Sequence, residues 1–310
     1  MTFPSDSVSP TPFYKKWQWY VAAISGLLIG LLLLLILSVL LLRWVNPSVT
    51  SFTVQDNWTV LESERYNLRD WWVDADELPE HLKWAVVASE DQLFWEHRGF
   101  DIESIRDAWQ QRQTGERSRG ASTISQQVAK NLYLWPAHSF FRKGLEMGIT
   151  ILIELFWTKE RILEIYLNIA EFGPGIYGVG KASDSFFGIN PNELEPEMSA
   201  RLAAVLPSPK RMRVNPPSPF AEERSRWILR QMTQLSGIAY LPDAEEEFPD
   251  MPDDIDPLLL EAEFLLDSHL DQVDEPSDTL TNTDSDDFEQ LDLPDSLLIE
   301  FEIDTMQIRE

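Results

Sequence analysis

The sequence predicts an all-α protein with one N-terminal transmembrane helix, a helical domain and an acidic C-terminal tail. Three observations support this class: an uncharged apolar run near the N-terminus, helix-like periodicity without strand alternation in the middle, and a final stretch rich in Asp and Glu. The predicted divisions are an N-terminal segment 1–16, a membrane anchor 17–42, a connector 43–64, a helical domain 65–240 and a tail 241–310.

The anchor prediction rests on residues 17–42, which contain no charged side chain. As a helix they extend about 39 Å, enough to cross a bilayer with some tilt. A cleaved signal peptide would have a shorter apolar run followed by a small-residue cleavage site, and neither is present. Lys15 and Lys16 favour a cytoplasmic N-terminus, although Arg43 opposes this bias. We therefore expect a single-pass protein whose main domain lies outside the cytoplasm.

The domain is predicted from helix-like stretches separated by capping residues and prolines. These stretches are 81–97, 101–113, 123–133, 140–156, 158–170, 195–206 and 220–236. Residues 147–157 are strongly apolar but too short to span a bilayer. A core helix and a surface that touches lipid both remain open for this segment.

Net charge is −27, but its distribution is uneven. Residues 241–310 contain 25 acidic residues and one basic residue, so the rest of the chain is close to neutral. A near-neutral body argues against nucleic-acid binding, which requires a basic face. The density of acids and prolines predicts a tail that does not pack as a domain. Its two short apolar clusters leave open a segment that folds onto a partner.

A first candidate site is the stretch Glu90–Gly99. In a helix, one face would carry Val86, Val87, Glu90, Phe94 and His97. A carboxylate on an apolar face is costly unless it is paired, and desolvation favours a general base. The alternative is an acid neutralised by Lys83 or Arg98.

A second candidate combines Arg142, Lys143 and Glu146. Arg142 and Glu146 are i,i+4 neighbours at the edge of an apolar stripe, so an acid lies beside two cations. An ordinary surface ion pair explains this pattern equally well.

A third candidate is the stretch Gly120–Asn131. Glycine and hydroxyl residues before a helix offer backbone N–H groups to an anion, and Lys130 lies within reach of a phosphate. Thr123 and Gln126 match a capping box. A plain capped helix explains Ser122 and Thr123, but it does not explain the amides and the cation that follow.

Other chemistries lack support in the sequence. The four histidines form no HExxH pattern, and there is no GxSxG elbow or Walker loop. The absence of cysteine excludes disulfides and thiolate metal sites. No cofactor is required by these patterns; a carboxylate-bound Mg²⁺ or Mn²⁺ is compatible with them, but no spacing predicts it.

The patterns in their order resemble glycosyltransferase family 51, the peptidoglycan glycosyltransferases. That family carries EDxxFxxHxG, GxSTxxQQxxKN, RKxxE and KxxILExYLN. The matching segments here are 90–99, 120–131, 142–146 and 159–168, and the resemblance covers about residues 65–240. The chain departs from the family at Phe186 and Ile189, where Tyr and Lys are usual. This departure puts any substrate contact by those two residues in doubt.

The resemblance implies a lysozyme-like fold in the bacterial inner membrane with the catalytic domain in the periplasm. It implies inverting, β-1,4-linked polymerisation of lipid II onto a strand carried by undecaprenyl pyrophosphate. Glu90 would be the base, and Glu146 would steady the donor side or orient the neighbouring cations. Substrate would be bound by Ser122, Thr123, Gln126, Gln127, Lys130, Arg142 and Lys143. Asp91, Phe94 and His97 would support the site.

Partners implied by the resemblance are the lipid-linked glycan strand, membrane lipids and candidate proteins of cell-wall synthesis or division. No SxxK or KTG pattern follows, so no transpeptidase activity is expected. Two alternatives remain at this point: a lytic enzyme of the same fold class, and a non-catalytic scaffold of the cell-wall machinery.

Overall fold

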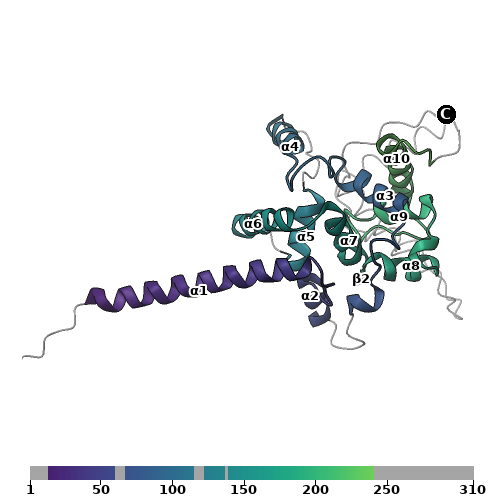
Figure 1. Ribbon diagram of the computed structural model, residues 1–310. Coiled ribbons are helices and arrows are strands. Elements are labelled where there is room, and N and C mark those ends of the chain that lie inside the picture. The colour runs from purple at the N-terminus through teal and green to yellow at the C-terminus, as the bar shows by residue number, and fades with distance from the viewer. Residues whose placement is uncertain (1–12, 60–66, 115–121, 137–138, 241–310) are drawn as a thin grey trace, which may run out of the picture. The chain divides into compact units, whose positions relative to one another are not determined.

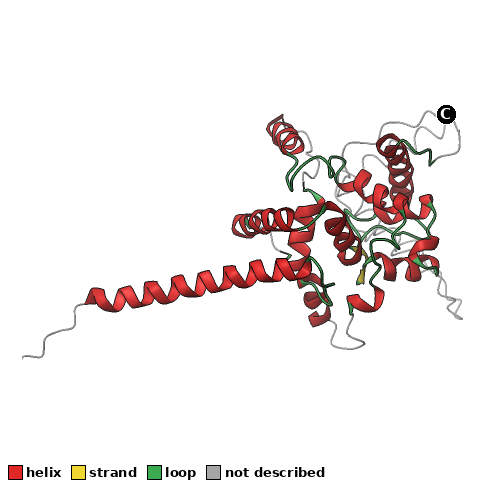
Figure 2. Cartoon of the chain, viewed as in Figure 1, coloured by secondary structure: helices red, strands yellow, loops and turns green. Residues whose placement is uncertain are grey.

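The computed structural model describes residues 13–59, 67–114, 122–136 and 139–240. Contacts divide the chain into two units, Met1–Phe264 and Leu265–Glu310, and every described residue belongs to the first. The predicted tail 241–310 and most of the predicted segment 1–16 lie outside the described residues. Helices dominate the described part, as Figure 2 shows, so the predicted all-α class is confirmed there.

The elements follow one another along the chain as labelled in Figure 1. The α-helices are α1 (Phe13–Leu42), α2 (Ser51–Thr59), α3 (Glu80–Glu90), α4 (Ile102–Thr114), α5 (Ile124–Tyr133), α6 (Phe140–Phe156), α7 (Lys159–Ile169), α8 (Val179–Phe187), α9 (Pro196–Ala204) and α10 (Pro219–Ser236). Two 3₁₀ helices, η1 (Leu68–Trp71) and η2 (Pro191–Glu193), and two short strands, β1 (Glu171–Gly173) and β2 (Ile176–Tyr177), complete the set.

Helix α1 contains the apolar run Trp17–Leu42, which is long enough to cross a membrane. Its last turn is bonded to the domain. The carbonyl of Val39 accepts from Trp157 Nε1 at 2.8 Å, and the carbonyl of Leu42 accepts from Arg161 Nη2 at 2.9 Å. In return, Arg43 Nη1 donates to the carbonyl of Phe156, the last residue of α6, at 2.7 Å. Helix ends leave carbonyls without intrahelical partners, and here the side chains of Trp157, Arg161 and Arg43 supply donors to the terminal carbonyls of α1 and α6.

The core is built around α5 and α7. Helix α5 packs against α2, α6 and α7, while α3, α9 and α10 form a second packed group. Ile124 and Val128 of α5 and Ile162 and Ile165 of α7 are fully buried. Their spacing along each helix places one apolar stripe toward the centre of the domain.

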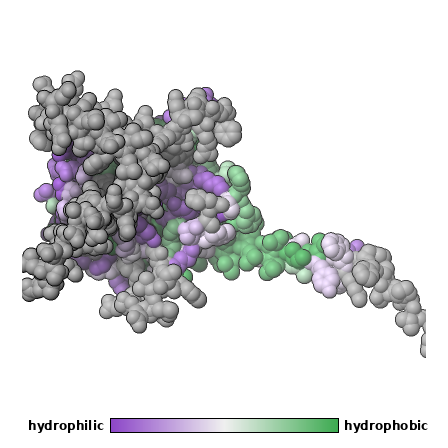
Figure 3. All heavy atoms as spheres, turned by 180° about the vertical axis from the view of Figure 1, so that it is seen from behind, coloured by the Kyte–Doolittle hydropathy of each residue, from purple (hydrophilic) through white to green (hydrophobic). Residues whose placement is uncertain are grey.

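Helix α6 has two apolar faces with different environments. Ile149, Ile153 and Trp157 are buried in the core. The opposite face is exposed and carries Phe140, Phe141, Leu145, Met147, Ile151 and Leu155. Figure 3 shows hydrophobic surface running from α1 onto the adjoining part of the body, and α1 packs against α6. The core interpretation of segment 147–157 therefore holds for one face, and the other face is an exposed apolar surface whose contact with lipid stays a prediction.

One predicted helix is wrong in its extent. The stretch 81–97 was expected to be continuous, but α3 ends at Glu90 because Asp91 adopts φ −164° and ψ 76°. Asp91 leaves the helix to bond the start of α5, and turns follow through His97. Glu90, Phe94 and His97 thus do not share one helical face; Phe94 reaches the core from the loop.

The structure also contains elements that the sequence did not reveal. Helix α2 lies within the predicted connector 43–64, and β1 pairs with β2 in an antiparallel hairpin. Close approach of backbones explains two glycines there. A Cβ on Gly178 would lie 2.6 Å from the carbonyl oxygen of Asn168, and one on Gly180 would lie 2.1 Å from that of Trp71. Only glycine allows these contacts between η1, α7 and the start of α8.

Candidate functional site

Glu90 lies at the last position of α3, and its side chain is about nine-tenths buried, with 11% exposed. Its Oε2 accepts a hydrogen bond from Gln127 Nε2 at 2.7 Å. Its Oε1 accepts from the Ser89 hydroxyl at 3.2 Å and lies 4.0 Å from Arg224 Nη2. The carboxylate is thus held by directional donors and keeps limited access to solvent, as a general base requires.

Gln127 connects Glu90 to the core. Its Oε1 accepts a hydrogen bond from the Tyr166 hydroxyl at 3.1 Å, while its Nε2 donates to Glu90. Tyr166 belongs to α7 and is fully buried. Burial raises the pKa of Tyr166 well above its usual value, and the negative charges of Glu90 and Asp91 raise it further. The phenol therefore remains protonated.

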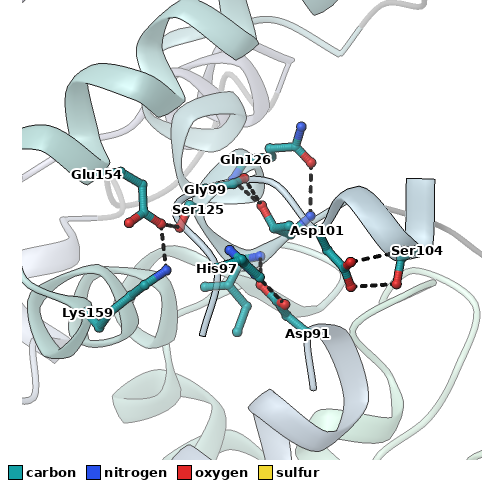
Figure 4. Close-up of polar contacts among 11 residues, drawn as sticks. Asp91, His97, Gly99, Asp101, Ser104, Ser125, Gln126, Glu154 and Lys159 are labelled. Atoms are coloured by element: carbon teal, nitrogen blue, oxygen red, sulfur yellow. Dashed lines mark hydrogen bonds and ion pairs between the residues drawn. The ribbon is translucent and has the colours of Figure 1, made fainter. Parts of the chain in front are cut away.

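The first turn of α5 is closed by side chains (Figure 4). Thr123 is the N-cap and forms the predicted capping box with Gln126. The Thr123 hydroxyl also donates to the carbonyl of Gly99 at 2.7 Å. Asp91 Oδ2 accepts from the amide of Ile124 at 3.0 Å, while its Oδ1 lies 2.7 Å from His97 Nε2. A buried carboxylate at a helix N-terminus is favoured by the helix dipole.

This arrangement changes the interpretation of the third candidate site. The amides of Ile124 and Gln126, which were expected to face an anion, already donate to Asp91 and to Thr123. Thr123 and Gln126 are buried, and their polar atoms bond the backbone of the loop and helix. Ser122 is exposed. The geometry therefore leaves Lys130, rather than the start of α5, as the feature of this stretch best suited to an anion.

A second network fixes the same turn against α6 and α7. Ser125 Oγ donates to Glu154 Oε1 at 2.5 Å, and Lys159 Nζ bonds the same oxygen at 2.8 Å (Figure 4). The Lys159 ammonium also lies 4.5 Å from the ring centroid of Phe94. Gly99 packs against this network, since a Cβ there would lie 3.0 Å from Glu154 Cγ. Phe94, His97 and Gly99 thus serve packing and orientation.

The predicted trio on α6 is assembled in the structure. Glu146 is buried, its Oε2 lies 2.6 Å from Arg142 Nη1, and its Oε1 lies 2.5 Å from Lys143 Nζ. Arg142 is buried with it, while the side chain of Lys143 is 42% exposed. One acid therefore faces two cations, and the group carries a net positive charge. This is more than the surface ion pair that was the alternative.

Lys130 is near enough to Glu146 and Glu90 for the charges of both acids to act on it. Burial lowers its pKa, while the charges of Glu146 and Glu90 act to raise it, and Arg142 and Lys143 lower it further. Among the described residues, its ammonium makes no ion pair; its nearest ring contact is Phe52, 5.9 Å from the centroid. A desolvated cation without a carboxylate of its own is suited to an anionic ligand.

A family model described as transglycosylase matches residues 57–233. The chain belongs to the transglycosylase family. Proteins named biosynthetic peptidoglycan transglycosylase are similar to it. One from Xanthomonas oryzae pv. oryzae is 48% identical over 215 residues, 67% of this chain and 85% of that protein. One from Ectopseudomonas mendocina is 46% identical over 225 residues, 72% of this chain and 93% of that protein. One from Xylella fastidiosa is 45% identical over 231 residues, 74% of this chain and 94% of that protein.

The family membership and the glycosyltransferase activity expected from the sequence are thereby confirmed. In this transglycosylase the structure brings Glu90, Gln127 and Lys130 together from α3 and α5, and Arg142, Lys143 and Glu146 together on α6. Tyr166 and Arg224 were not predicted as site residues. Tyr166 falls inside the segment 159–168, but its link to Gln127 spans 39 positions and only the fold reveals it.

Among the described residues, the arrangement of acidic and histidine side chains does not support a metal site. The residues that the structure describes contain no group of three or more His, Asp and Glu side chains able to hold a metal ion. The departures at Phe186 and Ile189 are partly buried and pack against the core, and the Phe186 carbonyl accepts from Asn215 at 2.7 Å.

Proposed function

We propose that this transglycosylase polymerises lipid II into β-1,4-linked peptidoglycan strands at the outer face of the bacterial inner membrane. The donor is a growing strand on undecaprenyl pyrophosphate, and the acceptor is lipid II. The observation that carries this proposal is the pairing of a buried, oriented carboxylate with a separate cationic group. Glu90 supplies the first, and Lys130 with the Arg142–Lys143–Glu146 trio supplies the second.

Glu90 acts as the general base in this scheme. It removes the proton from the acceptor hydroxyl, whose oxygen forms the new bond to the anomeric carbon of the donor as the bond to pyrophosphate breaks. Attack from the face opposite the leaving group inverts the configuration. A positioned base of this kind typically contributes about 10²–10⁴-fold to the rate.

The cations stabilise the leaving group. Pyrophosphate departs as an anion, so positive charge near its oxygens replaces a general acid. Lys130 carries an ammonium without an ion-pair partner among the described residues, and Arg142 and Lys143 add charge that Glu146 orients. Glu146 bonds both cations, so we assign it to the donor side and not to proton transfer from the acceptor.

The apolar surfaces of α1 and α6 also support the proposal that the substrates are linked to lipid. The span Trp17–Leu42 crosses the bilayer in this proposal, with its N-terminus in the cytoplasm. The exposed apolar face of α6 continues from the end of α1 and is suited to the boundary between headgroups and acyl chains. Both proposed substrates carry polyprenyl chains, so the enzyme and its substrates would lie in the same membrane.

The test is to supply the purified full-length protein with lipid II and follow the glycan products. Lengthening strands and released undecaprenyl pyrophosphate are expected, without a requirement for added cofactor; a chelator series measures the contribution of Mg²⁺ or Mn²⁺. Shortening of preformed strands without use of lipid II would identify a lytic enzyme instead. Absence of both reactions would support a scaffold. Covalent labelling by a fluorescent penicillin would contradict the expected lack of a transpeptidase.

A further inference from the structure

Gln127 has two hydrogen bonds that define which way its carboxamide faces. An ionised carboxylate can only accept hydrogen bonds, so the amino group of Gln127 must face Glu90, 2.7 Å away. The carbonyl end then needs a donor, and the Tyr166 hydroxyl supplies one at 3.1 Å. The bond to Glu90 therefore determines the amide orientation, because a flipped amide would place its carbonyl oxygen against the carboxylate, and in the observed orientation Tyr166 donates to the carbonyl.

Tyr166 is suited to be a permanent donor. Its side chain is fully buried within α7, and burial keeps the pKa of its phenol well above the usual value. The hydroxyl has no other hydrogen bond within the described part of the chain. Its hydroxyl can therefore affect Glu90 by hydrogen bonding only by way of Gln127.

We propose that Tyr166 and Gln127 form a positioning pair that aims the carboxylate of Glu90 at the acceptor hydroxyl, an inference that rests on the proposed role of Glu90 as base. The pair occupies Oε2. Oε1 has longer contacts, 3.2 Å to the Ser89 hydroxyl and 4.0 Å to Arg224, and it is the oxygen that receives the acceptor's proton. Neither member of the pair exchanges a proton with substrate. Gln127 is thereby reassigned from binding sugar to orienting the base.

A double-mutant cycle on the full-length protein tests this pair. Tyr166→Phe removes only the hydroxyl, and Gln127→Met removes both hydrogen bonds while keeping side-chain length. In a detergent assay, Tyr166→Phe should lower kcat about 3- to 10-fold, as expected for one lost hydrogen bond, with KM for lipid II unchanged. In the Gln127→Met background, adding Tyr166→Phe should lower kcat no further, because Tyr166 acts through Gln127.

Tyr133→Phe is the matched control. It also removes a hydroxyl with a 3.1 Å hydrogen bond, to Ser38 of α1, and that hydroxyl takes no part in the hydrogen bonds of Glu90 and Gln127. Its kcat in detergent should equal that of the wild type. Melting curves of each variant show whether it is folded.

Three outcomes would overturn the inference. Wild-type kcat in Tyr166→Phe would remove Tyr166 from the pair. An equal loss in both backgrounds would show that the hydroxyl acts independently of Gln127. If Tyr166→Phe does not fold, Gln127→Met alone decides: a raised KM with unchanged kcat would make Gln127 a substrate ligand, whereas a lowered kcat with unchanged KM supports the pair. Failure of the proposed function is visible separately, because wild-type protein would then not polymerise lipid II.

Discussion

In the first turns of α5, the side chains of Thr123, Ser125, Gln126 and Gln127 all have partners inside the protein, whereas the outer face of α6 presents large apolar side chains to the surroundings. In the first region, the hydrogen-bond partners constrain both the type and the orientation of each side chain. On the outer face of α6, the only requirement on the side chains is that they are apolar. In the proposed function, the chemistry then depends on directional hydrogen bonds, and membrane contact by α6 depends on apolar area.

The largest loss of activity is expected from a change at Glu90, whose carboxylate is held by directional hydrogen bonds. Glu90→Gln should keep the fold, because the amide has the same shape, and should lower kcat about 10²–10⁴-fold in a lipid II polymerisation assay. Glu96→Gln is the matched control, since Glu96 is exposed six residues further along the same segment. Near-normal turnover in folded Glu90→Gln would show that the base lies elsewhere.

Lys130 should give the next largest effect. Lys130→Ala removes the cation proposed to stabilise the leaving group and should lower kcat/KM about 10²-fold. Burial lowers the pKa of Lys130, so its charge and the activity should be lost as pH rises through that lowered value, earlier than for an ordinary lysine.

Lys130→Arg separates charge from shape. Arginine stays protonated at alkaline pH, so the alkaline decline of kcat/KM should move to higher pH even if the rate at neutral pH is reduced. An unchanged alkaline limb in Lys130→Arg would indicate that another group titrates there.

The outer face of α6 should tolerate change better. Replacing Ile151 and Leu155 together by Ser should leave activity in detergent unchanged and lower it about two- to fivefold on vesicles, because α1 still holds the protein at the surface. Ile238→Ser, at an exposed apolar residue outside α6, is the control and should change neither rate. Equal activity of the α6 variant on vesicles would remove this face from the membrane contact.

The smallest effect is expected from the acidic tail. Deleting residues 241–310 should preserve polymerisation in detergent, because no residue assigned to the chemistry lies in that segment. A large loss of activity in the truncated protein would show that the tail belongs to the catalytic unit.

The same contrast explains what could be predicted from the sequence. The capping box, the trio on α6 and the apolar run of α1 are local patterns, since each depends on spacings of a few residues, and the structure contains all three. The end of α3 at Glu90 could not be predicted in this way. It depends on the amide of Ile124, which lies 33 positions from Asp91 and competes for its carboxylate. Tyr166 was missed for the same reason.

The joint between α1 and the domain has a mechanical consequence. All four terminal carbonyls of α1 have donors: those of Val39 and Leu42 from Trp157 and Arg161, and those of Leu40 and Leu41 from the chain just beyond. No loose linker therefore separates the span from α6 and α7. A helix of about 39 Å exceeds a hydrocarbon core of about 30 Å and accommodates the difference partly by tilting. In the proposed function, a tilt of the span would turn α6 and α7 with it, so bilayer thickness would set the angle at which Lys130 and the α6 cations meet a lipid pyrophosphate.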